Sequence, residues 1–170
     1  HGPKGVGFLY ASSTGFDSYL HGGDQEQKKR AGTENLAAIV GMVAALKEDL
    51  NNQAKHYQKL SALKSAFLEE IADLDYYLNE SQDQLPYVLN IGFPGQKNDL
   101  LLLRLDLEGI SISTGSACTA GIVQTSHVLE AFYGPDSHRL KESVRISLSP
   151  LNTEEELKQL AQTLKNIIGD

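Results

Sequence analysis

Cysteine, tryptophan and long apolar runs are scarce or missing in this sequence. It has one cysteine, Cys118, and no tryptophan. A single cysteine excludes an internal disulfide, so folding does not depend on an oxidising compartment. No apolar run approaches the roughly 20 residues that cross a bilayer, and no signal segment stands at the start. We therefore expect a cytoplasmic protein without a membrane anchor.

Basic residues are also in the minority. Lys and Arg number 15 against 22 Asp and Glu, which gives a formal net charge of -7. Binding to nucleic acid or to an anionic membrane depends on clustered basic side chains that neutralise phosphates. The one basic cluster, residues 28–30, is too short to change this balance. The charge therefore argues against a nucleic acid or an anionic membrane as the partner. The length of 170 residues is enough for one domain with a sizeable core.

Small residues surround the single cysteine. Residues 111–121 read Ser-Ile-Ser-Thr-Gly-Ser-Ala-Cys-Thr-Ala-Gly, with no large apolar side chain within three positions of Cys118. A thiol that packs in a core behaves as a small hydrophobe and is expected among large apolar neighbours. We therefore interpret the segment as a loop whose thiol can react if a cation or a helix N-terminus lowers its pKa. The alternative is an inert cysteine, which is common.

Apolar residues three or four positions apart predict a long helical region. A first stripe comprises Leu36, Ile39, Val40, Val43, Leu46 and Leu50. A second stripe comprises Tyr57, Leu60, Leu63, Phe67, Ile71 and Leu74. No proline occurs between Pro3 and Pro86. The region is therefore either one long helix with a bend near Asn51 and Asn52 or two helices joined there.

Short apolar or alternating segments predict the strands. Residues 5–11 are apolar and bounded by turn residues, which favours a buried strand, and residues 15–30 follow as a polar loop. Residues 87–93 and 110–113 are further strand candidates. Residues 144–149 alternate, which places Arg145 on the face away from the apolar set.

Capping residues mark where the later helices begin. The candidate N-caps are Asn98, either Thr125 or Ser126, and Thr153, which forms a capping box with Glu156. Gly109 is placed to end the first of these helices. Short strands that alternate with helices predict an α+β two-layer module.

The cysteine segment resembles a known active-site loop. Residues 113–120, Ser-Thr-Gly-Ser-Ala-Cys-Thr-Ala, are similar to the Ser-Ser-Gly-Ser-Ala-Cys-Thr-Ser loop of the group I, NifS/IscS-like, cysteine desulfurases. Thr114 and Ala120 depart from that pattern, but neither change affects the thiol. Three further segments match the family in the expected order: residues 1–5, 22–33 and 144–156. Group II enzymes carry the cysteine in a shorter context, so group I is the better match.

The resemblance implies a pyridoxal 5'-phosphate enzyme of the aspartate-aminotransferase fold type, in the class V aminotransferase family. By this comparison residues 1–33 end the large cofactor-binding domain, residues 34–74 form a connecting helix or helix pair, and residues 75–170 form the small α+β domain. The cofactor's attachment lysine would lie just upstream of His1, where the chain opens without Met. We therefore expect a fragment of a larger enzyme that is inactive alone. Lys4 belongs to a Gly-Pro-Lys-Gly turn and is expected to be a solvated lysine.

The resemblance also assigns roles to single residues. It makes Cys118 the nucleophile that takes sulfur from L-cysteine, leaving L-alanine and an enzyme persulfide for an acceptor or scaffold protein, as in iron-sulfur cluster assembly. It makes Arg145 the ligand of the substrate carboxylate. Thr33, with Gly32 beside it, matches a contact to the cofactor phosphate of the neighbouring subunit, which implies a homodimer. Without the resemblance, the simplest interpretation of Arg145 is a surface arginine, and that of Thr33 is a helix N-cap.

Two other functions are compatible with the same residues. An intact cysteine loop without the attachment lysine suits a cofactor-free persulfide carrier or protein-binding module. A related class V aminotransferase or selenocysteine lyase is the other alternative. No metal site is expected, because the five histidines share no ligand spacing and a second cysteine is missing.

Overall fold

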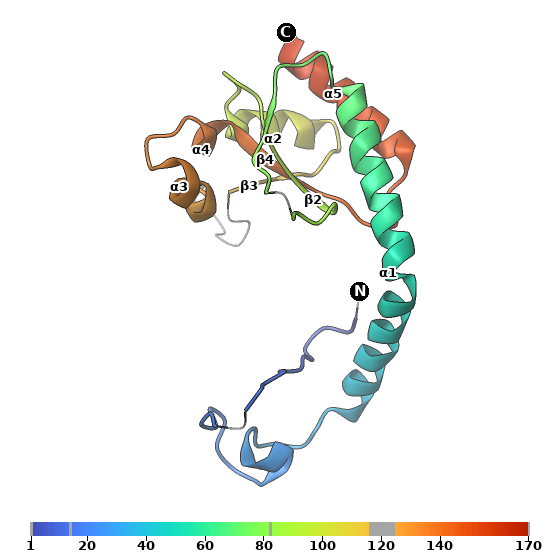
Figure 1. Cartoon of the computed structure of the whole chain (residues 1–170), viewed down its shortest axis with the longest axis vertical. Helices are drawn as coiled ribbons and strands as arrows, with labels where there is room; N and C mark the ends of the chain where they lie inside the picture. The colour runs from blue at the N-terminus through green and yellow to red at the C-terminus, as the bar shows by residue number, and fades with distance from the viewer. Residues whose placement is uncertain (1, 14, 82, 116–124, 170) are drawn as a thin grey trace. The chain divides into compact units, whose positions relative to one another are not determined.

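The computed structural model describes residues 2–13, 15–81, 83–115 and 125–169. The chain forms two compact units, His1–Ala54 and Lys55–Asp170. Helix α1, Leu36–Glu70, begins in the first unit and ends in the second (Figure 1). It runs through Asn51 and Asn52 without interruption, so one long helix forms rather than two.

In the first unit, the expected strand at residues 5–11 does not form. The segment has no strand partner among the described residues, and Phe8, Leu9 and Tyr10 are 71%, 74% and 85% exposed. A strand's backbone groups need a neighbouring strand, so an apolar sequence alone does not create one. The prediction of a loop over residues 15–30 is confirmed, with a short 3-10 turn, η1, at Gln25–Lys28 and a single bridge between Leu20 and Arg30.

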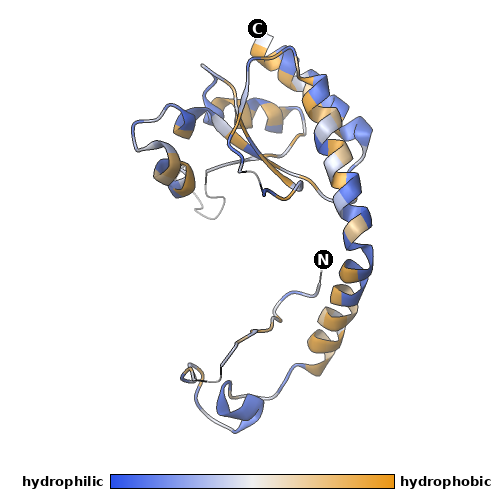
Figure 2. Cartoon of the chain, viewed as in Figure 1, coloured by the Kyte–Doolittle hydropathy of each residue, from blue (hydrophilic) through white to orange (hydrophobic). Residues whose placement is uncertain are grey.

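The two apolar stripes of α1 have different surroundings. In the first unit Leu36, Val40 and Leu50 remain exposed, and Figure 2 shows apolar residues gathered along this part of the helix. In the second unit Leu63 and Phe67 are buried in the hydrophobic core. Among the described residues, the part of α1 that contributes to the hydrophobic core is therefore in the second stripe.

The second unit contains a four-stranded antiparallel sheet in the order β1-β2-β4-β3. Its strands are β1 (Tyr77–Leu78), β2 (Val88–Gly92), β3 (Ser113–Thr114) and β4 (Ser143–Ser147). The strands expected at residues 87–93 and 144–149 are thus confirmed. The strand expected at residues 110–113 is shorter and begins only at Ser113.

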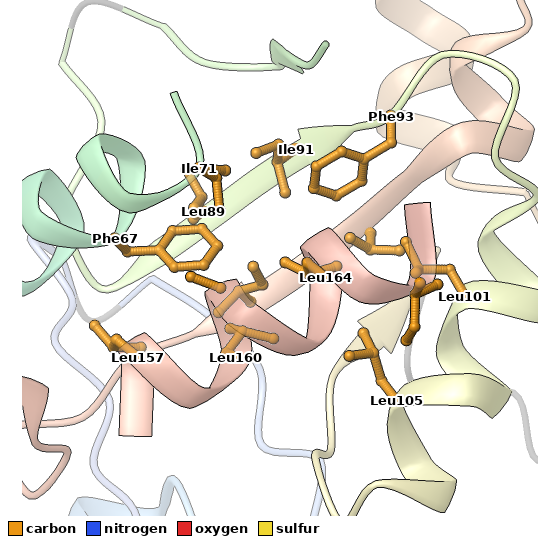
Figure 3. Packing of buried hydrophobic residues seen from close by; sticks show 14 of the residues in the cluster. Phe67, Ile71, Leu89, Ile91, Phe93, Leu101, Leu105, Leu157, Leu160 and Leu164 are labelled. Atoms are coloured by element: carbon orange, nitrogen blue, oxygen red, sulfur yellow. The ribbon is translucent and has the colours of Figure 1, made fainter. Parts of the chain in front are cut away.

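Alternate residues of the central strands build the core. Leu89 lies opposite Ile146 and Ile91 opposite Val144, and all four are buried. Three helices complete the core: the end of α1, α2 (Asn98–Leu107) and α5 (Glu154–Gly169). Figure 3 shows their side chains converging on the strand residues. The period-two pattern of β2 and β4 leaves the intervening side chains on the opposite face.

Two of the expected helix caps are present and one is wrong. Ser126 Oγ accepts from the N–H of Leu129 at the start of α3 (His127–Tyr133). Thr153 and Glu156 bond reciprocally, as a capping box does. Asn98 instead lies inside α2 after the N-cap Lys97. Its buried amide donates to the carbonyl of Leu140, within the short helix α4 (Arg139–Glu142), and to that of Ser143, the C-cap of α4.

The capping box is expected to make the stability of the protein depend on pH. Hydrogen bonds from the Asn152 amide and then from the Thr153 N–H lower the pKa of Glu156. A carboxyl whose pKa is lower in the folded than in the unfolded state stabilises the protein at pH values above its unfolded-state pKa of about 4. This stabilisation is lost as the pH falls. We expect Glu156→Gln to be less stable than the wild type at neutral pH, with a difference that shrinks on acidification. Denaturant unfolding at several pH values measures it, and a constant difference would refute this origin.

Candidate functional site

The sheet face opposite the core is polar and includes the predicted substrate ligand. We call it the polar face and define it by Asn79, Asn90, Ser113, Ser143 and Arg145. In the strand register, Arg145 of β4 lies opposite Asn90 of β2 on one side and Ser113 of β3 on the other. The expectation that Arg145 points away from the apolar set is thus confirmed by the register.

Arg145 has an unsatisfied donor. The residue is half-buried, and its Nε is the one buried side-chain nitrogen or oxygen among the described residues without a hydrogen-bond partner. A guanidinium is always charged and has five donors and no acceptor. An unsatisfied buried donor costs about 1–3 kcal/mol. Arg145 is therefore not a fully solvated surface arginine, and its geometry suits an anion with oxygen acceptors.

The strand next to Arg145 leads toward the cysteine. Ser113 lies opposite Arg145 in β3, and Cys118 follows Ser113 by five positions in the sequence. Cys118 itself falls outside the residues that the structure describes. The register thus brings the start of the cysteine segment beside Arg145, while the role of the thiol stays a prediction.

Gly32 and Thr33 belong to the first compact unit. The N-cap of α1 is Asn35, whose Oδ1 accepts from the N–H of Ala38 at 3.2 Å, so the interpretation of Thr33 as the N-cap is wrong. Asparagine is a preferred N-cap, and this signal was available in the sequence. The hydroxyl of Thr33 is exposed and has no partner in the described part of the chain.

Of the two donors that this segment offers to a phosphate, only one is free within the described residues. A phosphate is bound by hydroxyl groups and N–H groups near helix starts, and the free hydroxyl of Thr33 fits that requirement. The N–H of Gly32, by contrast, donates to Gln25 Oε1 at 3.1 Å. Gly32 also has a φ of 97°, a backbone conformation that favours glycine. Gly32 therefore shapes the turn, and the exposed Thr33 hydroxyl is available to an anion such as a phosphate.

The polar face also carries a hydrogen-bond network that the sequence did not reveal. Arg139 Nη1 donates to Asn79 Oδ1 at 2.8 Å. Asn79 Nδ2 donates to Asn90 Oδ1 at 2.8 Å and to Ser143 Oγ at 2.9 Å. Only Asn90 lies in a strand that the sequence predicts, at residues 87–93, and no local pattern links it to Asn79, Ser143 or Arg139. The network ends at Asn90, directly opposite Arg145.

Two tyrosines hold Arg139 at the start of this network. Its guanidinium lies 4.1 Å from the ring centroid of Tyr77 and 4.5 Å from that of Tyr133, as in cation–π contacts. The Tyr77 ring lies across Gly92, where any Cβ would collide with it. Burial raises the pKa of Tyr77, whose hydroxyl donates to Glu142 Oε2 at 3.3 Å.

Two kinds of feature are absent from the described residues. No group of three or more His, Cys, Asp or Glu side chains in these ranges is arranged to hold a metal ion. Likewise, no helix within the described parts combines the length and apolar character needed to span a membrane.

Comparisons with known proteins agree with this fold and these segments. The cysteine desulfurase IscS of Dictyoglomus turgidum is 39% identical over 172 residues, covering 99% of this chain and 43% of the relative. The cysteine desulfurase NifS of Azotobacter vinelandii is 36% identical over 173 residues, with 99% and 43% covered. The chain thus spans less than half the length of these relatives.

A solved structure and a family model extend the likeness to the whole chain. The structure of a NifS-like protein aligns with a TM-score of 0.84 at 30% identity, covering 99% of this chain and 43% of that one. The chain therefore contains part of the fold of these enzymes, with mixed helix and sheet. The model of the aminotransferase class-V family matches residues 1–160. The chain belongs to the aminotransferase class-V family, and within it resembles the NifS/IscS-like cysteine desulfurases.

Proposed function

We propose that this chain is the C-terminal part of a pyridoxal-phosphate-dependent cysteine desulfurase, which converts L-cysteine to L-alanine and transfers the sulfur to Cys118. The observation that carries the proposal is the buried, unpaired Nε of Arg145, opposite the strand that leads to the cysteine segment. Relatives named cysteine desulfurase, 36–39% identical over 99% of the chain, support the same assignment.

Arg145 binds and orients the substrate in this proposal. The carboxylate of an amino acid offers two oxygens that match two parallel N–H groups of a guanidinium, which fixes orientation as well as charge. Half-burial strengthens this ion pair relative to one in bulk water, because solvent screens it less. A substrate carboxylate would also satisfy the donor that the described residues leave unpaired.

Cys118 accepts the sulfur. Its thiolate forms a bond with the substrate sulfur while the substrate carbon–sulfur bond breaks, leaving the electron pair on carbon, which gains a proton to give L-alanine. When bound, pyridoxal phosphate supplies an electron sink for charge on the substrate carbon. Cys118 follows Thr114 by four positions, and a fully extended chain spans at most about 14 Å over four positions. The length of the chain therefore limits how far Cys118 can lie from β3, the strand that pairs with Arg145.

The remaining parts of the proposal concern the assembly. Thr33 would contact the cofactor phosphate of the neighbouring subunit of a homodimer, because its exposed hydroxyl is available. Residues 1–33 would end the large domain, residues 34–74, which contain α1, would connect the domains, and residues 75–170 would form the small domain. The persulfide would pass to a cytoplasmic acceptor or scaffold protein, such as one for iron-sulfur cluster assembly.

Replacement of the nucleophile tests the proposal. We expect the full-length protein to release sulfide and L-alanine in equal amounts from L-cysteine in the presence of a thiol reductant. Cys118→Ala should reduce this activity to background, because no other side chain of this segment can hold the sulfur as a persulfide. Sulfide and alanine are quantified in parallel on the same reaction.

A neighbouring substitution controls for disturbance of the segment. Ser111→Ala changes an exposed residue of the same stretch and is expected to retain wild-type activity. Full activity in Cys118→Ala would contradict the proposal. A wild type that accepts persulfide from another enzyme but releases no alanine from L-cysteine would instead support the carrier function.

A further inference from the structure

We propose that Asn90 is a second binding residue for the substrate carboxylate, acting beside Arg145, and that Arg139 and Asn79 are positioning residues that hold the Asn90 amide in the binding orientation. This inference rests on the proposed function, in which Arg145 binds the carboxylate of an amino acid. It starts from the direction of the hydrogen bonds on the polar face.

Arg139 sets the direction of the network. A guanidinium can only donate, so the atom of Asn79 that receives Arg139 Nη1 at 2.8 Å must be the carbonyl oxygen Oδ1. The Asn79 amide nitrogen is then forced to the other side, where its two hydrogens reach Asn90 Oδ1 and Ser143 Oγ. Turning the Asn79 amide round would place its nitrogen against the Arg139 donor. The orientation of Asn79 is therefore determined by chemistry.

The same reasoning orients Asn90. Because Asn79 donates to Asn90 Oδ1, the Nδ2 group of Asn90 must point to the other side of its amide plane. Nδ2 has no hydrogen-bond partner in the described ranges. Asn90 thus presents donor hydrogens and no free amide acceptor on that side.

Arg145 presents a second unsatisfied donor on the same face. Asn90 and Arg145 are directly opposite each other in the β2–β4 register, and such pairs have Cβ atoms about 4.5–5.5 Å apart. The polar face therefore combines a charged guanidinium whose Nε lacks a partner with a neutral amide whose Nδ2 lacks one. A ligand that satisfies both must offer several acceptors and negative charge, and a carboxylate does so.

The positioning residues are themselves held firmly. Arg139 lies over the rings of Tyr77 and Tyr133. The Asn79 side chain accepts from Arg139 and donates to Asn90 and Ser143. An amide that is already oriented loses less conformational freedom when the ligand binds. Asn90 contacts the substrate carboxylate, and the other members of the network increase the affinity for it by holding Asn90 in place.

Asn90→Asp in the full-length holoenzyme tests the binding role. Aspartate retains an oxygen for Asn79 but replaces the Nδ2 donor with a second, negatively charged oxygen. We expect the Kd of L-alanine, measured by calorimetry, to rise at least about 10- to 100-fold, because a donor to the carboxylate is lost and the new charge opposite Arg145 repels the carboxylate. Ethylamine, which is alanine without its carboxylate, should bind as it does to the wild type. Asn51→Asp adds the same charge at an exposed position of α1 and should change neither Kd.

Asn79→Asp tests the positioning role. The variant still accepts from Arg139 but turns an oxygen toward Asn90 Oδ1, so the Asn90 amide should rotate and present its oxygen to the carboxylate. We expect the same selective loss for L-alanine with ethylamine binding retained. A structural role alone would weaken both ligands together, and that result, or an unchanged Kd in Asn90→Asp, would overturn the inference. A wild type that binds L-alanine through Asn90 but releases no sulfide from L-cysteine would refute only the proposed function.

Discussion

Arg145→Ala is expected to lower kcat/KM for L-cysteine about a thousandfold in the full-length enzyme. Truncating one partner of a desolvated ion pair costs about 2–5 kcal/mol, and each 1.36 kcal/mol is about tenfold in rate. Arg145 is half-buried and its Nε has no partner in the described residues, so the substrate carboxylate is the partner that we assign to it. Steady-state kinetics with L-cysteine measure the loss.

Arg145→Lys is the matched variant. Lysine retains the positive charge but loses the planar pair of donors, so we expect an intermediate loss rather than wild-type activity. The circular dichroism of both variants should match the wild type, because the Arg145 side chain makes no hydrogen bond to the described residues and its backbone pairing in the sheet is unchanged. An Arg145→Ala enzyme with unchanged kcat/KM would show that the carboxylate binds elsewhere.

Phe67→Ala should lower the free energy of unfolding by about 3–5 kcal/mol, the usual cost of removing a large aromatic side chain from a core. Phe67 is 2% exposed and lies with Leu89, Leu160 and other members of the core, as Figure 3 shows. The ring reaches from α1 to the layer between β2 and α5, so its loss leaves a cavity that the sheet and helices fill only in part. Guanidinium-induced unfolding measures the change.

Tyr57→Ala provides the comparison on the same helix. Tyr57 is 52% exposed, and surface substitutions of this kind change stability by about 0.5 kcal/mol or less. Both variants remove an aromatic ring from α1, so helix propensity cancels between them. Equal destabilisation would contradict the placement of Phe67 in the core and of Tyr57 at the surface of the same helix.

Elements with a complete local pattern were predictable from the sequence. The strand β4 alternates strictly, and α5 begins with a capping box and continues with a buried apolar stripe. Residues 5–11 have an equally apolar sequence but form no strand in the described chain. The difference is that a helix satisfies its own backbone, whereas a strand requires a partner that local sequence does not report.

Long-range contacts explain why other predictions were wrong or missing. Asn98 has the right residue type for a cap, yet its amide bonds to carbonyls 42 and 45 positions away. Arg139 and Asn79 meet across 60 positions, a spacing that carries no periodic signal. Arg145 was found through its family segment, and alternation alone placed it on the correct face. Sequence patterns predicted the face of the site but not the network on it.

Transfer of sulfur from L-cysteine to Cys118 is best followed by mass spectrometry of the peptide that contains this residue. After the full-length holoenzyme is mixed with L-cysteine and alkylated, we expect the Cys118 peptide to gain the mass of one sulfur atom, while L-serine in place of L-cysteine gives no gain. Alanine produced with an unmodified Cys118 peptide at every reaction time would contradict it.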